Sequence, residues 1–171
     1  MASRRVCKYT LDTGPGSQTI LVNLDVDMAR GFAILGELLV TKSVTDAIDT
    51  LDVRLQSCNS ADAANPVWNT RARFAQILGN MTTSASAPEI RDIALQKFGT
   101  LSDGEEAYEP SGSAGGSDLA AGSVLNGPFP GPRRTSAGRQ PSWRLKIDVV
   151  DADADADFEG AITLWLDTAD E

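Results

Sequence analysis

Four aspartates alternate with alanines near the C-terminal end of the chain. Asp151, Asp153, Asp155 and Asp157 lie two residues apart in the run DADADADFEG. Ca²⁺ takes about six to eight oxygen ligands in proteins, and carboxylates at alternate positions of a curved loop can supply several of them. In a fully extended strand the four side chains would share one face and repel one another. The pattern therefore predicts a loop, with these four aspartates as candidate Ca²⁺ ligands; a solvated acidic turn without a cation is the alternative.

The spacing differs from that of an EF-hand. An EF-hand loop has glycine at about its sixth position and glutamate at about its twelfth, whereas Ala156 and Ile162 occupy these positions when the loop is counted from Asp151. The candidate site therefore does not match an EF-hand loop.

The sequence contains few other groups that could carry out catalysis or bind a cofactor. The chain has no histidine, which removes Ser-His-Asp and Cys-His nucleophile systems and histidine metal sites. It also contains no P-loop, no dinucleotide-binding fingerprint and no CxxC pair. We expect no enzymatic activity, no catalytic residues and no cofactor other than a possible Ca²⁺.

The negative charge is concentrated at the C-terminal end. The net charge is −9, and residues 147–171 contain nine carboxylates and no Lys or Arg, so the first 146 residues are balanced. Such an end would repel phosphates, and we expect no direct nucleic-acid binding. No apolar run reaches the roughly eighteen residues of a membrane span, and the N-terminus lacks the apolar segment of a secretory signal. Cys7 and Cys58 are interpreted as reduced, semi-buried thiols, with one disulfide as the alternative.

Period-2 alternation of apolar and polar residues predicts strands along most of the chain. Two segments, 32–40 and 89–98, also fit a helix; flanking strands and Gly36 favour a strand in the first, and a strand is preferred in the second. The predicted strands are 4–11, 19–28, 32–40, 51–56, 68–74, 89–98, 143–150 and 161–167.

Residues 102–142 differ in composition, because 20 of these 41 residues are Gly, Pro or Ser. We interpret them as an extended loop or arm within one domain that spans 1–171, because strands are predicted at both ends of the chain. Seven or eight antiparallel strands separated by turns predict an all-β fold, a β-sandwich or jelly roll.

Tryptophans and arginines offer further candidate surfaces. Trp68 and Trp143 lie on the apolar faces of their strands and are predicted to pack in the core, whereas Trp165 lies opposite Ile162, Leu164 and Leu166. Trp165 is therefore the best candidate for a surface or interface aromatic. Arg133, Arg134 and Arg139 make the end of the arm basic, and they are candidates for pairing with the acidic end within or between subunits.

The segment from Leu51 to Ile77, LDVRLQSCNSADAANPVWNTRARFAQI, is predicted to form a hairpin. It resembles a segment of structural proteins of tailed bacteriophages, in which a Leu-Asp-Val-Lys-Leu-Gln strand leads through a Ser/Asn/Asp loop to a Trp and a second strand. The matching residues cover about a sixth of the chain and are Leu51, Asp52, Val53, Leu55, Gln56, Ser57, Trp68, Phe74 and Gln76. The 102–142 arm departs from this pattern.

The resemblance implies a β-sandwich component of a virion, such as a capsid decoration or minor capsid protein, and it supplies no catalytic residues. On this hypothesis the protein is located in the virion, binds other virion proteins and itself through loops or termini, and contacts neither nucleic acid nor a membrane. A carbohydrate-binding or adhesion module, with or without a Ca²⁺ at the aspartate run, is the alternative, and a small enzyme or cellular binding domain is a third.

Overall fold

The computed structural model describes residues 2–26, 31–43, 48–58, 66–81, 86–96, 119–124, 142–153 and 157–168, and these residues contain nine strands and no helix. Among them there is consequently no helix long and apolar enough to cross a membrane. The strands are β1 (Ala2–Asp12), β2 (Gln18–Leu24), β3 (Gly31–Lys42), β4 (Thr50–Cys58), β5 (Asn69–Arg73), β6 (Ile77–Leu78), β7 (Glu89–Gln96), β8 (Ser142–Val150) and β9 (Glu159–Thr168).

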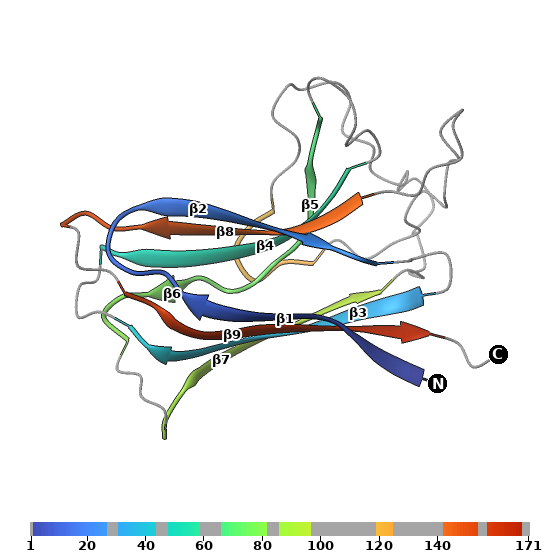
Figure 1. The fold of residues 1–171 in the computed structure, drawn as a ribbon, viewed down its shortest axis with the longest axis horizontal. Coiled ribbons are helices and arrows are strands. Elements are labelled where there is room, and N and C mark those ends of the chain that lie inside the picture. The colour runs from blue at the N-terminus through green and yellow to red at the C-terminus, as the bar shows by residue number, and fades with distance from the viewer. Residues whose placement is uncertain are drawn as a thin grey trace.

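The strands form two antiparallel sheets that face each other (Figure 1). Sheet I has the order β1-β9-β3-β7, and sheet II has the order β2-β8-β4-β5, with the short β6 also paired to β4. The prediction of an all-β sandwich is confirmed. Both ambiguous segments are strands, β3 and β7.

Strands distant in sequence pair in a nested order. β1 pairs with β9, β2 with β8, β3 with β7 and β4 with β5. Consecutive strands from β1 to β4, and again from β7 to β9, alternate between the sheets. Both ends of the chain are therefore required to complete sheet I, in which β9 lies between β1 and β3.

Alternate residues of both sheets form the core. Residues that pair directly across an antiparallel sheet lie on the same face, and the fully buried apolar residues follow this rule, as Ile34 pairs with Leu166 and Val53 with Ile147. Gly36 lies on the inner face of β3, where an added Cβ would lie 2.8 Å from Ile93 Cγ1. Glycine thus leaves the space that side chains from β7, β9 and sheet II occupy.

Sheet II also buries polar residues on its outer face, which strand alternation did not predict. Asp52 on β4 is only 5% exposed. It accepts two hydrogen bonds from the Arg73 guanidinium, one of 2.9 Å from Nε, and lies 2.9 Å from Arg54 Nη2. Arg54 also pairs with Asp148 on β8. The alternation of β4 indicated that only one face of the strand is buried. Long side chains of β4 itself and of its neighbour β5 cover the outer face as well.

The predictions for the tryptophans and the hairpin need correction in two places. Trp143 is buried in the core as predicted, but Trp68 is only half-buried, with the Arg144 guanidinium 3.9 Å from its ring centroid. The alternation from Trp68 to Phe74 is broken because a bulge shifts the register between Leu55 and Gln56 of β4. In addition, β6 was not predicted; two residues are too few to display a period.

The two ends of the sandwich differ in character. β1 and β3 end, and β2, β4 and β9 begin, at the end opposite the chain termini (Figure 1). We call this the acidic end, because its described carboxylates include Asp12, Asp49, Glu89, Asp151, Asp153, Asp157 and Glu159. Within the 102–142 arm, the structure describes residues 119–124 and Ser142. Val124 forms an isolated β-bridge with Ala72 of β5.

Candidate functional site

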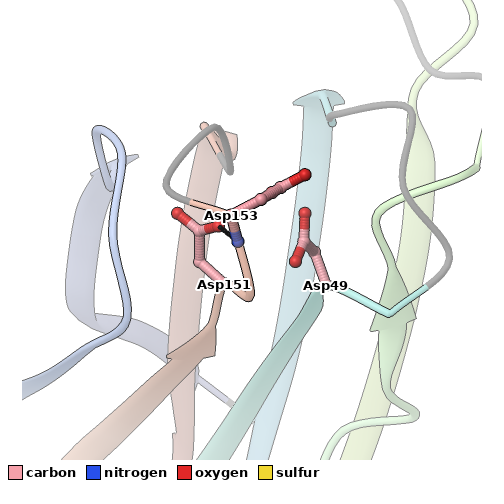
Figure 2. Close-up of side chains that lie close together, drawn as sticks. All are labelled: Asp49, Asp151 and Asp153. Atoms are coloured by element: carbon pink, nitrogen blue, oxygen red, sulfur yellow. Dashed lines mark hydrogen bonds between the residues drawn. The ribbon is translucent and has the colours of Figure 1, made fainter.

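The register of sheet II brings a third aspartate beside the C-terminal acidic run. Thr50 of β4 pairs with Val150 of β8. The next residues outward are Asp49, which precedes β4, and Asp151, which follows β8. One carboxylate oxygen from each of Asp49, Asp151 and Asp153 lies within 4.8 Å of the others. Figure 2 shows the three carboxylates converging above the ends of these strands.

Asp49 is fixed in place and buried. The residue is completely buried, with 0% of its surface exposed. Its backbone carbonyl accepts a 2.8 Å hydrogen bond from the amide of Gly79, and its Oδ1 accepts a 3.0 Å bond from the amide of Ala152. Its Oδ2 is buried and has no hydrogen-bond partner among the described residues. A carboxylate oxygen in this state is costly unless something neutralises it.

Asp151 connects the site to the turn between β1 and β2. The amide of Gly16 donates a 2.5 Å hydrogen bond to its Oδ2, and the amide of Asp153 donates a 3.2 Å bond to its Oδ1. The Ser17 hydroxyl accepts a 2.8 Å hydrogen bond from the amide of Asp151 and donates a 2.9 Å bond to its carbonyl. The bond from residue 153 to the side chain of residue 151 is the pattern by which aspartate closes its own turn. It bends the chain so that Asp153, which is exposed, returns toward Asp49 (Figure 2).

Asp157 is directed elsewhere. Phe158, its neighbour, is fully buried. The carbonyl of Phe158 accepts a 3.1 Å hydrogen bond from the amide of Thr13, and the amide of Phe158 donates a 3.0 Å bond to the Thr13 hydroxyl. Asp157 instead lies 2.5 Å from Lys42 Nζ, and Glu159 lies 2.8 Å from the same nitrogen. These two hydrogen bonds raise the pKa of the Lys42 ammonium well above its usual value.

The structure therefore groups Asp151 and Asp153 with Asp49 and pairs Asp157 with Lys42. Asp155, Arg133, Arg134 and Arg139 lie outside the described residues. Asp49 was missed because it lies in a polar stretch, between Asp46 and Asp52, that shows no alternating carboxylate pattern. The available signal was its position immediately before the apolar alternation of Leu51, Val53 and Leu55, but only the β4–β8 register places it opposite Asp151.

A second candidate surface is the outer face of sheet I. The register places Trp165 of β9 beside Leu35 of β3, which lies beside Ala94 of β7. Four residues further along β3, beyond Glu37, Leu39 lies beside Ile90. Leu35 is 37% exposed and Ile90 is 47% exposed. Trp165 is half-buried and lies opposite the inward-facing Ile162, Leu164 and Leu166, as its strand pattern predicted.

Charges of opposite sign border this apolar surface. Arg5 and Lys8 lie on the same face of the edge strand β1, paired with Trp165 and Thr163. Asp92 lies on the other edge strand, β7, paired with Glu37 of β3. Arg5, Lys8 and Asp92 are exposed. The face thus has a basic edge on β1 and an acidic edge on β7, and between them Trp165, Leu35 and Leu39 lie on either side of Thr163 and Glu37.

The cysteines lie in different sheets, Cys7 on β1 and Cys58 on β4. Neither forms a disulfide; Cys58 is buried and Cys7 is half-buried, in line with the interpretation of both as reduced thiols. Burial raises the pKa of the Cys7 thiol, which makes it a poorer nucleophile at neutral pH.

Fold and sites together define the class of this protein: a two-sheet antiparallel β-sandwich with a carboxylate cluster at one end and an apolar, charge-bordered outer sheet face. Comparisons with protein-family models, with curated proteins and with solved structures give no match to the chain. The resemblance to bacteriophage structural proteins therefore stays a prediction.

Proposed function

We propose that this protein is a non-enzymatic, jelly-roll structural component of a virion that assembles with copies of itself through the outer face of sheet I. The nested pairing of β1 with β9, β2 with β8, β3 with β7 and β4 with β5 supports the jelly-roll assignment. Jelly rolls occur in viral capsid domains and lectins, so the fold alone does not select the function. The hairpin resemblance supports the virion over the lectin.

The observation that carries the assembly proposal is the set of apolar side chains on the central strands of sheet I, Trp165, Leu35 and Leu39, between a basic and an acidic edge. A two-fold axis parallel to the strands and passing between β9 and β3 would lay β1 of one copy over β7 of the other. Trp165 would then cover Leu35 of the second copy, and Lys8 would approach its Asp92. Two-fold interfaces require such a self-complementary patch, and complementary edge charges favour one orientation.

Sedimentation equilibrium of the purified chain tests this proposal. We expect a reversible monomer–dimer equilibrium that weakens as salt is raised, because the edge charges are exposed and screened. Leu35→Glu should raise the dimer Kd by about tenfold or more, since it places a charge in the apolar centre of the interface. A monomeric wild-type protein at millimolar concentration would contradict the self-assembly proposal.

Leu21→Glu is the matched control. Leu21 is 53% exposed but lies on β2, at the edge of sheet II, so this variant should dimerise like the wild type. Lys8→Glu should weaken the dimer, and the double variant with Asp92→Lys should restore it. Equal dimerisation of the Leu35→Glu and Leu21→Glu variants would place the interface elsewhere.

The virion assignment has a separate test. If it is correct, the protein should remain with particles of its phage through density-gradient banding and high-salt washing, at a copy number in proportion to the major capsid protein. Its absence from banded particles would contradict the virion role while leaving the dimer result intact.

The half-buried Trp165 on an outer face also supports the alternative of a carbohydrate-binding module, because sugars stack on such rings. Glycan-array binding that is lost in the Trp165→Ala variant would favour this alternative; an array without binding would leave the structural role as the better proposal.

A further inference from the structure

We propose that Asp49, Asp151 and Asp153 form a Ca²⁺ site that fastens three connections together at the acidic end of the sandwich. The site differs from the one the sequence pattern suggested, because Asp49 replaces Asp157 as a ligand. It does not depend on the virion role or on self-assembly.

The first support is the buried oxygen of Asp49. Asp49 is completely buried, its Oδ2 has no hydrogen-bond partner among the described residues, and Figure 2 shows its carboxylate directed toward the space beneath Asp153. Asp49 Oδ1 is already used by the amide of Ala152. A buried, unsatisfied anionic oxygen beside two further carboxylates is explained by a cation that binds all three.

The second support is the spacing of the ligand atoms. Two oxygens bound to one Ca²⁺ at about 2.3–2.6 Å lie at most about 4.6–5.2 Å apart, whereas two bound to Mg²⁺ at about 2.0–2.1 Å lie at most about 4.2 Å apart. The three carboxylate oxygens lie within 4.8 Å of one another, a separation that one Ca²⁺ can span; Mg²⁺ would require all three separations to be below about 4.2 Å. Water completes the coordination on the exposed side of Asp153.

The third support is the way that the backbone holds the ligands. Gly16 and Asp153 donate amide hydrogen bonds to Asp151, and Gly79 donates one to the carbonyl of Asp49. A cation at this point would therefore couple the β1–β2 turn, the segment that precedes β4 and the segment that follows β8. Without the cation the three carboxylates repel one another, and the cluster reduces the stability of this end of the fold.

Thermal unfolding and calorimetric titration of the intact chain with CaCl2 test the site. With three carboxylate ligands we expect one bound ion and a Kd of about 10⁻⁴–10⁻³ M. At ten times Kd the melting temperature should rise by about 3–6 °C. MgCl2, and NaCl at matched ionic strength, should produce smaller rises. Absence of both heat and a melting shift at 10 mM Ca²⁺, about ten times the weakest expected Kd, would overturn the proposal.

Variants separate specific binding from screening of a chain with net charge −9. Asp49→Asn and Asp153→Asn should each weaken Ca²⁺ binding by about tenfold or more, since each removes one charged ligand. Asp153 is exposed, so its variant should fold even if the buried Asp49→Asn variant does not.

Asp157→Asn and Asp25→Asn are the controls, because Asp157 pairs with Lys42 and the exposed Asp25 follows β2 at the opposite end of the sandwich. Both should keep the wild-type Ca²⁺ response. An equal response in Asp153→Asn and Asp25→Asn would show screening only. Loss of the response in Asp157→Asn alone would support the ligand set that the sequence pattern suggested.

Discussion

Replacing Gly160 with alanine is expected to lower the free energy of unfolding by about 3 kcal/mol. A Cβ at residue 160 would lie 1.9 Å from the carbonyl oxygen of Leu39 and 3.0 Å from Cα of Val40. These are backbone atoms of β3, paired to β9 on one side and to β7 on the other. A backbone held between two strands cannot move aside as a flexible side chain can, so β9 must separate from β3 at this point.

The position of Gly160 has a structural reason. The β3–β9 register shifts between Val40 and Lys42, which leaves Thr41 as an extra residue opposite Gly160. Glycine within a strand often marks such a bulge or a close backbone approach. The bulge directs the Thr41 hydroxyl to the carbonyl of Glu159, at 3.2 Å, and Lys42 to the carboxylate of Asp157. Gly160→Ala should therefore disturb the acidic end as well as overall stability.

Urea unfolding followed by tryptophan fluorescence measures this effect. Ala161→Ser is the matched control: it adds one atom to the next residue of β9, on the outer face, and should change stability by no more than about 0.5 kcal/mol. If Gly160→Ala unfolds at the same urea concentration as Ala161→Ser, the close contact with Leu39 does not exist.

Replacing Asp52 with alanine is the second change with a large expected effect, a loss of about 3 kcal/mol. Asp52 is the buried acceptor for two arginines, and its removal leaves the partly buried guanidinium groups of Arg54 and Arg73 without this carboxylate. Removing one partner of a buried ion pair typically costs about 3–5 kcal/mol; the lower end applies here because both arginine side chains retain some contact with water.

A double-mutant cycle separates the pair from its surroundings. Arg73 also donates a 2.8 Å hydrogen bond to the carbonyl of Leu119. That bond is lost both in Arg73→Met alone and in Arg73→Met combined with Asp52→Ala, so the cycle cancels it. We expect the double variant to be more stable than the sum of the single losses by at least about 1 kcal/mol.

Asp25→Ala is the control for loss of an exposed aspartate and should have little effect on stability. Additive losses for Asp52 and Arg73 would mean that the hydrogen-bonded pair contributes nothing beyond its two members. Because this pair is mostly buried, 1 M salt should weaken the coupling only slightly, in contrast to the exposed contact proposed between Lys8 and Asp92.

Alternation by itself predicted eight of the nine strands and the direction of most side chains. Ile162, Leu164 and Leu166 face the core and Trp165 faces outward, as expected from their period of two. This succeeds because a strand with one buried face must place apolar residues at every second position whatever its partners are. Alternation failed where the environment of the second face depends on a neighbour. Asp52 appeared exposed from β4 alone, and only the arginines of β4 and β5 bury it.

The aspartate run that first suggested a cation site shows the same division. The composition of residues 151–157 determined that this connection is acidic, and their chemistry determined that Ca²⁺ is the natural candidate. Tertiary structure decided which carboxylates meet. The burial of Phe158 turns Asp157 toward Lys42, and the pairing of Thr50 with Val150 brings Asp49 to Asp151 across about one hundred residues of chain. Local sequence carries no information about that register, because it is set by the nested pairing of strands from both halves of the protein.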